Sequence, residues 1–143
     1  MSDTDPVVKR SDEIEYEAVD VDESHSDSSG SQNAERSGDA ADGLRKGVLI
    51  DEEDGAPNFA IRRFELDAGA EVPEHTNEVE HEQYVLAGEY VVGIEDEEYT
   101  VSAGDSLLIP AGAVHWYRNE ADRPGAFLCA VPNGDDAIEL VEK

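Results

Sequence analysis

The chain has 143 residues, of which 36 are Asp or Glu and 10 are Lys or Arg, giving a formal net charge of −26. This length suits one domain with a tail, and the negative charge argues against nucleic acid and anionic membranes as partners. The single cysteine, Cys129, excludes an internal disulfide and lies in an apolar run, where we expect a buried small hydrophobe. Because the sequence shows neither a signal segment nor a run of about 20 apolar residues, we expect a cytoplasmic protein without a membrane segment.

The acidic residues are spread along the chain rather than confined to one end. A folded domain this negative repels itself at low salt and needs cations to screen the charge. The composition therefore favours a halophilic protein. The alternative is an acidic protein of an ordinary cell.

Residues 1–43 are predicted to form an acidic, low-complexity extension. Within residues 13–20, apolar side chains alternate with Glu, which is typical of a short edge strand. Residues 22–43 are Ser, Asp, Gly and Ala with almost nothing to bury, which indicates a disordered, flexible linker. His25 lies in this linker, where we expect it to be solvated.

Residues 44–143 are predicted to form an all-β domain. Short β-rich runs alternate with turn signals such as Ala68-Gly69 and Ala103-Gly104. We expect strands over residues 48–50, 59–66, 83–86, 90–94, 99–101, 106–109, 115–118 and 126–131. Many short strands at this spacing predict a sandwich or barrel.

Two further segments of this domain carry predictions. The acidic run 95–98 lies between two expected strands and is predicted to be the tip of a hairpin. A helical pattern is present only over residues 135–142, where Ile138 and Val141 are three positions apart. An exposed sheet edge or apolar face would be covered in a homodimer, which we therefore expect.

Three of the four histidines, His75, His81 and His115, fall inside the all-β domain. Because side chains alternate along a strand, His75 and Asn77 should share one face, as should His115 and Tyr117. Neutral imidazoles that converge from neighbouring strands suit a divalent transition metal, and three protein ligands leave positions open for water or substrate. The alternative is a set of separate histidines, each hydrogen-bonded in its own loop.

The residues around these histidines resemble the paired motifs of the cupin superfamily. The second motif, G-x5-P-x-G-x2-H-x3-N, is matched by Gly104, Pro110, Gly112, His115 and Asn119. The first motif, G-x5-H-x-H-x3-E-x6-G, is matched by Gly69, His75 and Gly88, with Asn at position 77 and His at position 81. The resemblance covers roughly residues 44–132. It implies a double-stranded β-helix, the cupin or jelly-roll barrel, usually dimeric and with a divalent metal in the barrel.

His81 in the usual Glu position resembles a subgroup of small single-domain cupins whose first motif reads H-T-H-P-W-E-H-E and whose metal is held by four histidines. The corresponding stretch here reads His75-Thr-Asn-Glu-Val-Glu-His-Glu82. The resemblance implies His75, His81 and His115 as metal ligands. Asn77 would be a weak fourth ligand through its amide oxygen, or would leave an open position, or would mark a site that has lost its metal. Mn or Fe is the expected ion, with Zn, Ni or Cu as alternatives.

Several neighbours of His81 are further candidates. Glu80 and Glu82 are rival ligands, although alternation directs Glu82 to the face opposite His81. Gln83 shares the parity of His81 and could line the cavity or bind a ligand, or be a polar residue of the barrel wall. Tyr117 could direct its hydroxyl inward beside His115 or simply fill the core.

The leading functional hypothesis is a metal-binding cupin that acts on a small organic molecule. Mn or Fe would support oxygenase-like chemistry, and a Lewis-acidic ion would support an isomerase or lyase. The histidines have no evident general base beside them, so no catalytic residue is assigned. The alternative is a regulatory or binding module with a degenerate metal site that holds a small molecule without turnover. A structural barrel with a dead site is a third interpretation.

Overall fold

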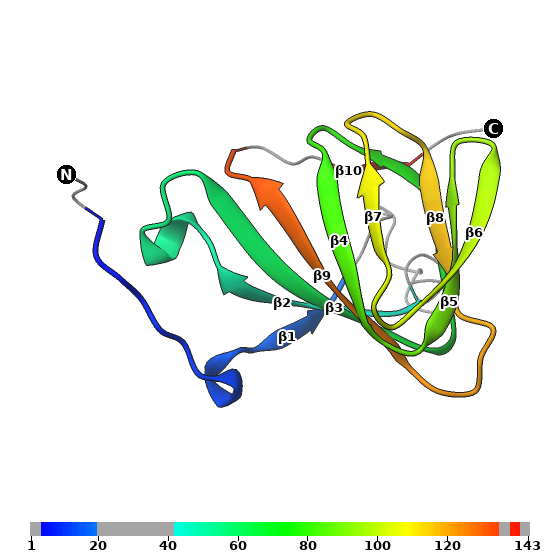
Figure 1. Cartoon of the computed structure of the whole chain (residues 1–143), viewed down its shortest axis with the longest axis horizontal. Coiled ribbons are helices and arrows are strands. Elements are labelled where there is room, and N and C mark those ends of the chain that lie inside the picture. The colour runs from blue at the N-terminus through cyan, green and yellow to red at the C-terminus, as the bar shows by residue number, and fades with distance from the viewer. Residues whose placement is uncertain (1–3, 20–41, 135–137, 141–143) are drawn as a thin grey trace, which may run out of the picture.

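The structure, a computed structural model, describes residues 4–19, 42–134 and 138–140, and most of these residues lie in β-strands (Figure 1). The described part of the chain contains two short 3-10 helices, η1 (Ser11–Glu13) and η4 (Glu52–Asp54). The strands are β1 (Tyr16–Ala18), β2 (Asp42–Ile50), β3 (Phe59–Asn77), β4 (His81–Ala87), β5 (Glu89–Ile94), β6 (Glu97–Ser102), β7 (Ser106–Ile109), β8 (His115–Arg118), β9 (Gly125–Pro132) and β10 (Ile138–Leu140). Among the described residues, no helix is long and apolar enough to cross a membrane.

The strand predictions for residues 48–131 are confirmed, because each predicted segment falls within one observed strand. Alternation is clear on β4, where His81, Gln83 and Val85 are buried while Glu82 and Tyr84 are exposed. The predicted tip at 95–98 is a tight hairpin between β5 and β6, in which only residues 95 and 96 lie outside the two strands. The all-β prediction therefore holds at the level of individual strands.

The long strand β3 connects the two sides of a curled sheet (Figure 1). Residues 59–66 pair with β9 and, on the other side, with β2, whereas residues 71–75 pair with β8. The sheet order is β6-β5-β8-β3-β9-β4-β7. The turn predicted at Ala68-Gly69 was expected to end the strand, and this prediction is wrong. The chain bends there, with Gly69 at φ 80, but the strand continues through the bend.

The two ends of the chain correct three predictions. The helical interpretation of 135–142 is wrong for Ile138–Leu140, which form β10 and pair with His75–Asn77 of β3. The predicted strand at 13–20 is shorter, because η1 precedes it and only Tyr16–Ala18 pair, with β2. Most of the predicted linker, like His25, lies outside the described residues, but its last two positions, 42 and 43, already belong to β2.

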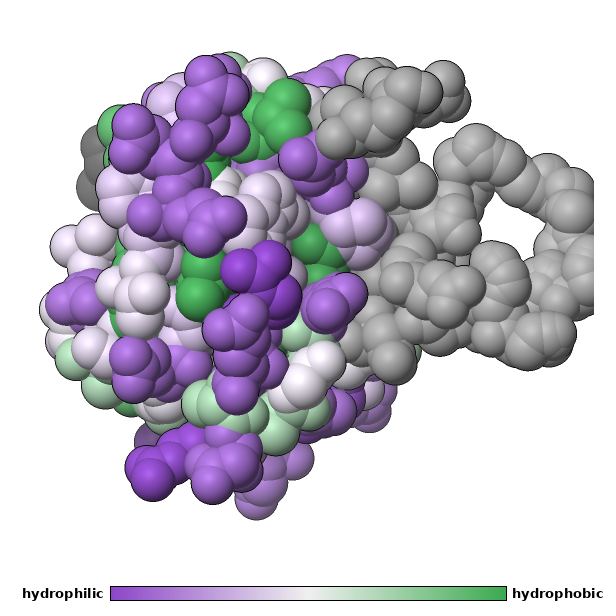
Figure 2. Space-filling model, turned by 90° about the vertical axis from the view of Figure 1, so that its right-hand side faces the viewer, coloured by the Kyte–Doolittle hydropathy of each residue, from purple (hydrophilic) through white to green (hydrophobic). Residues whose placement is uncertain are grey.

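The core lies between the two sides of the curled sheet. Leu66, Val85 and Val92 are completely buried, and the rings of Tyr90 and Phe127 are almost so. The outward-facing side chains include exposed hydrophobic residues, such as Tyr84 and Leu86 of β4 and Leu108 of β7. Figure 2 shows hydrophilic side chains interspersed with small hydrophobic patches over the side that carries β5, β6 and β8. This is the arrangement expected for an acidic shell around a modest apolar core.

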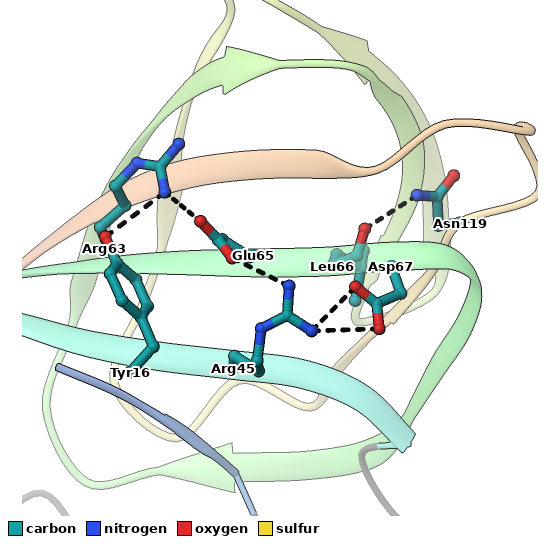
Figure 3. Close-up of polar contacts among 7 residues, drawn as sticks. All are labelled: Tyr16, Arg45, Arg63, Glu65, Leu66, Asp67 and Asn119. Carbon is teal, nitrogen blue, oxygen red and sulfur yellow. Dashed lines mark hydrogen bonds and ion pairs between the residues drawn. The ribbon is translucent and has the colours of Figure 1, made fainter.

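A network of ion pairs fastens β1 and β2 to β3 (Figure 3). Glu65 accepts hydrogen bonds from Arg45, at 2.9 Å, and from Arg63. Arg45 also donates to both carboxylate oxygens of Asp67, and Arg63 donates to the hydroxyl of Tyr16 at 3.4 Å. Because these residues alternate with the inward-facing residues of β2 and β3, the network occupies the outer face and leaves the inner face to the cavity.

Candidate functional site

The inner face of the curled sheet encloses a cavity of about 220 Å³. Its wall combines apolar side chains with a polar cluster that includes all three histidines of the domain. The lining residues are Val19, Leu44, Lys46, Arg62, Phe64, Val72, His75, Asn77, His81, Gln83, His115, Tyr117 and Phe127. Every residue that the sequence suggested as a metal ligand or pocket residue is therefore here, except the rivals Glu80 and Glu82.

The three histidines reach this cavity from three strands. His75 of β3 lies directly opposite His115 of β8, and the centroids of their rings are 4.2 Å apart. His81 begins β4 on the other side of the curled sheet, with its ring centroid 6.4 Å from that of His115. All three are buried, with 1 to 5% of each residue exposed. The alternation of β-strands thus brings together residues up to forty positions apart.

Each imidazole is oriented through its Nδ1 atom. Nδ1 of His75 lies 2.8 Å from the carbonyl oxygen of Pro73, and Nδ1 of His115 lies 3.0 Å from that of Ala113. Nδ1 of His81 lies 3.3 Å from Sγ of Cys129. An Nδ1–H that donates to a backbone carbonyl fixes the tautomer and makes Nε2 the atom through which the ring would bind a metal. His75 and His115 have this arrangement, whereas at His81 the partner is the Cys129 thiol, which can donate or accept.

Asn77 completes the polar cluster at the end of β3. It is 94% buried and lines the cavity, while its backbone carbonyl accepts a hydrogen bond from the amide of Gly112 at 2.9 Å. The rival ligands are on the outside. Glu80 and Glu82 are exposed, and their mutual hydrogen bond raises the pKa of Glu82. Neither Glu80 nor Glu82 therefore takes the place of the glutamate ligand that the usual first motif supplies.

Gln83 and Tyr117 face each other across the cavity wall. The side-chain nitrogen of Gln83 donates to the Tyr117 hydroxyl at 2.8 Å, and its oxygen Oε1 has no hydrogen-bond partner among the described residues. Only 3% of Gln83 is exposed. Burial, reinforced by the nearby Cys129, raises the pKa of Tyr117, so its phenol keeps its proton and can donate a hydrogen bond.

Sequence reasoning missed three residues of the site. Cys129 is fully buried as expected, but it contacts His81 rather than only apolar neighbours. Burial disfavours its thiolate, yet the hydrogen bond with His81 and the charges of His81 and Arg62 outweigh burial and lower the pKa of the thiol. Arg62 and Lys46 also line the cavity. The alternation of side chains along β3 and β2 could have identified them. Arg62, for example, lies two positions before Phe64, so the two side chains point to the same, inner face of the strand.

The chemistry of these side chains fits a divalent transition metal, but the structure does not bring them together into a complete coordination sphere. Within residues 4–19, 42–134 and 138–140, no group of three His, Cys, Asp or Glu side chains is placed closely enough to count as a metal site. The types of residue nevertheless fit. Three buried imidazoles, each held through Nδ1, and an amide face one cavity, and this combination suits Fe, Ni, Cu or Zn better than Ca or Mg.

Asn119, the last residue of the second motif, has a structural role. It is 1% exposed, and its amide donates to the carbonyls of Leu66 and Arg123, each at 3.0 Å, while its oxygen accepts from the amide of Ala121. Figure 3 shows the contact with Leu66. Asn119 does not line the cavity, so this part of the motif fixes backbone geometry.

Comparisons with known proteins agree with this architecture. Residues 62–131 match the family model described as the Cupin domain. The polyketide cyclase RemF of Streptomyces resistomycificus is similar in structure, with a TM-score of 0.66 and 29% identity over 71% of this chain and 72% of that one. A cupin 2 domain-containing protein of Halorhodospira halophila has a TM-score of 0.65 and 26% identity, over 70% of this chain and 71% of the other.

A cupin-2 domain protein of Rhodospirillum rubrum extends the likeness beyond the matched domain. The match covers 98% of this chain and 83% of that protein's chain. Its TM-score of 0.71 at 18% identity shows the shared fold. No curated protein sequence matches this chain.

Proposed function

The chain belongs to the cupin superfamily, and from this premise we propose that it binds one divalent transition metal ion and acts on a small organic molecule in the barrel cavity. The observation that carries the proposal is the convergence of His75, His81 and His115 from three strands on one buried cavity. Sequence similarity to a polyketide cyclase, an enzyme that acts on an organic molecule, supports the same class of function.

The three imidazoles would hold the ion, and the amide oxygen of Asn77 would be the weak fourth ligand. A bound ion of this kind supplies Lewis acidity, or redox chemistry if it is Mn or Fe. The protein's own contribution is to orient the rings through Pro73, Ala113 and Cys129 and to surround the reacting molecule with a wall of apolar and polar side chains. Among the described residues no carboxylate lines the cavity, so a proton donor or acceptor would come from Tyr117, a histidine or the substrate itself.

Elemental analysis of the full chain, purified without a tag in high KCl, tests the proposal. We expect about one transition metal ion per chain in the wild type, loss of the ion in His75→Ala, and no loss in His25→Ala. The latter variant is a matched control because it removes the one histidine outside the proposed ligands. A wild type that carries no metal and takes up neither Mn nor Fe in a titration would refute the metal site.

One observation favours a second function, a binding module that holds a small molecule without turning it over. Asn77 supplies a neutral amide where the related four-histidine motif has an imidazole, which weakens the ligand set. In that case the wild type would purify without metal, whereas Asn77→His, which adds the fourth imidazole, would purify with it. Metal content of this pair therefore separates the two functions without a known substrate.

A further inference from the structure

The described lining of the cavity contains basic but no acidic side chains, in a chain with a net charge of −26. About a quarter of the chain is Asp or Glu, yet none of the thirteen described residues that line the cavity is acidic. Two of them, Lys46 and Arg62, are basic, in a chain that has only ten basic residues. They lie on the paired strands β2 and β3, on the same side of the cavity as Phe64. This wall would attract an anion, and it would do so with or without the additional charge of a metal ion.

The second feature is a buried acceptor that the protein does not satisfy. Gln83 donates its amide hydrogens toward the Tyr117 hydroxyl and toward Sγ of Cys129, at 2.8 and 3.8 Å. With the amide placed in this way, Oε1 has no hydrogen-bond partner among the described residues. A buried carbonyl oxygen without a donor costs about 1–3 kcal/mol. A ligand that presents a hydroxyl or N–H to Oε1 would remove that cost.

The third feature is the size and shape of the space. A core cavity of about 150 Å³ accepts benzene, so the 220 Å³ here has room for one six-membered ring with small substituents. The rings of Phe64, Phe127 and Tyr117 form a stack along the wall, with centroids 5.1 and 5.4 Å apart and planes within 17°. Such a wall suits a flat, unsaturated molecule.

From these features together we infer that the ligand is a monocyclic carboxylate that also carries a hydrogen-bond donor, with Arg62 and Lys46 binding the carboxylate and Gln83 Oε1 accepting from the donor. The inference deepens the proposed function, since it names the substrate class of the same cavity. It assigns specificity to residues of this chain that are not metal ligands. Arg62, whose guanidinium lies 5.6 Å from the Phe64 ring, would make the stronger contact because it can pair with both carboxylate oxygens.

Isothermal titration calorimetry with simple probes tests this, using the full chain at one fixed KCl concentration. The probes are the three ring isomers of hydroxybenzoate, benzoate, which lacks the donor, and phenol, which lacks the carboxylate. We expect the best hydroxybenzoate isomer to bind about tenfold or more tightly than either benzoate or phenol, since a hydrogen bond to a buried acceptor and a charge-assisted pair are each of that order. This comparison needs no variant and is therefore independent of whether a variant folds.

Three variants assign the contacts. Arg62→Gln should weaken hydroxybenzoate and benzoate by about tenfold and leave phenol unchanged. Gln83→Leu should weaken hydroxybenzoate and leave benzoate unchanged. Arg118→Gln, the matched control, makes the same charge change on the outside of β8, where Arg118 pairs with Glu120, and should change none of the affinities. Benzoate that binds as tightly as every hydroxybenzoate, or carboxylate affinity that Arg62→Gln does not alter, would overturn the inference.

Metal content measured on the same samples keeps the two proposals separable. If chelator-treated wild type without metal still binds hydroxybenzoate in an Arg62-dependent way, the ligand inference stands even where the metal proposal fails. If metal is present and its removal abolishes carboxylate binding while Arg62→Gln does not, the ion rather than the basic wall holds the carboxylate, and the inference is overturned. Binding of none of the single-ring carboxylates, with metal present, overturns it as well.

Discussion

Replacing Asn119 by Ala should destabilise the barrel without removing a site residue. The side chain makes three hydrogen bonds of 3.0 Å, two donated to backbone carbonyls and one accepted from a backbone amide, and it is almost fully buried. At about 1 kcal/mol of net stability for each bond, the loss is about 3 kcal/mol. The free energy of unfolding, measured by urea denaturation at constant KCl, should fall by that amount with an unchanged m-value.

Two further measurements make this prediction specific. Asn119→Asp keeps the acceptor for the Ala121 amide but loses both donated bonds, so it should be at least as unstable near neutral pH. Metal content of the folded Asn119→Ala protein should equal that of the wild type, because Asn119 does not line the cavity. A loss of less than about 1 kcal/mol, or a selective loss of metal from a stable variant, would refute the structural role.

Three other predictions follow from single contacts. Glu65→Gln should cost about 1 kcal/mol near pH 7. Hydrogen bonds from Arg45 and Arg63 lower the pKa of Glu65, so its contribution is present above the unfolded pKa of about 4.3 and disappears as the pH falls. In urea denaturation the difference in stability between variant and wild type should therefore shrink as the pH falls below about 4, and a difference that does not change with pH would contradict this origin. Gly93→Ala should cost about 1–3 kcal/mol because the new Cβ would overlap the Trp116 indole, which a lowered melting temperature and altered tryptophan fluorescence would reveal. Cys129 is fully buried, so its thiol should react with a disulfide reagent only when urea unfolds the chain, despite its lowered pKa; rapid labelling of the native protein would contradict the burial.

The strands were predictable because local pattern and final environment agree in this fold. Gly and Asp punctuate the chain where it turns, and alternation on β4 matches burial residue by residue. Two of the failures have a common cause. Ala68-Gly69 reads as a turn, but long-range pairing with β8 and β9 on either side carries β3 through the bend. Residues 138–140 have helical spacing, but the unpaired edge of β3 offers them a strand partner.

The histidines and their neighbours Gln83 and Tyr117 were predictable for the same reason, since parity along a strand decides which side chains face inward. What parity does not give is which inward side chains meet across the cavity. The contact of Cys129 with His81 depends on the register of β9 against β4, where Cys129 pairs with Gln83. Likewise, the sequence around Phe64 gives no sign that Phe127 stacks on its ring and that Tyr117 stacks on Phe127. Such contacts join residues far apart in sequence and are set by the closed sheet.

The bend in β3 explains how one strand can serve two parts of the site. Arg62 and Phe64 precede the bend and form the basic, aromatic wall, while His75 and Asn77 follow it and belong to the proposed metal site. The spacing of the two walls therefore depends on the bend at residues 67–70. Asn119 holds that bend from both sides, because its side chain binds Leu66 and its backbone pairs with Gly69 and Ala70. Asn119 thus supports the backbone between the two walls without lining the cavity itself.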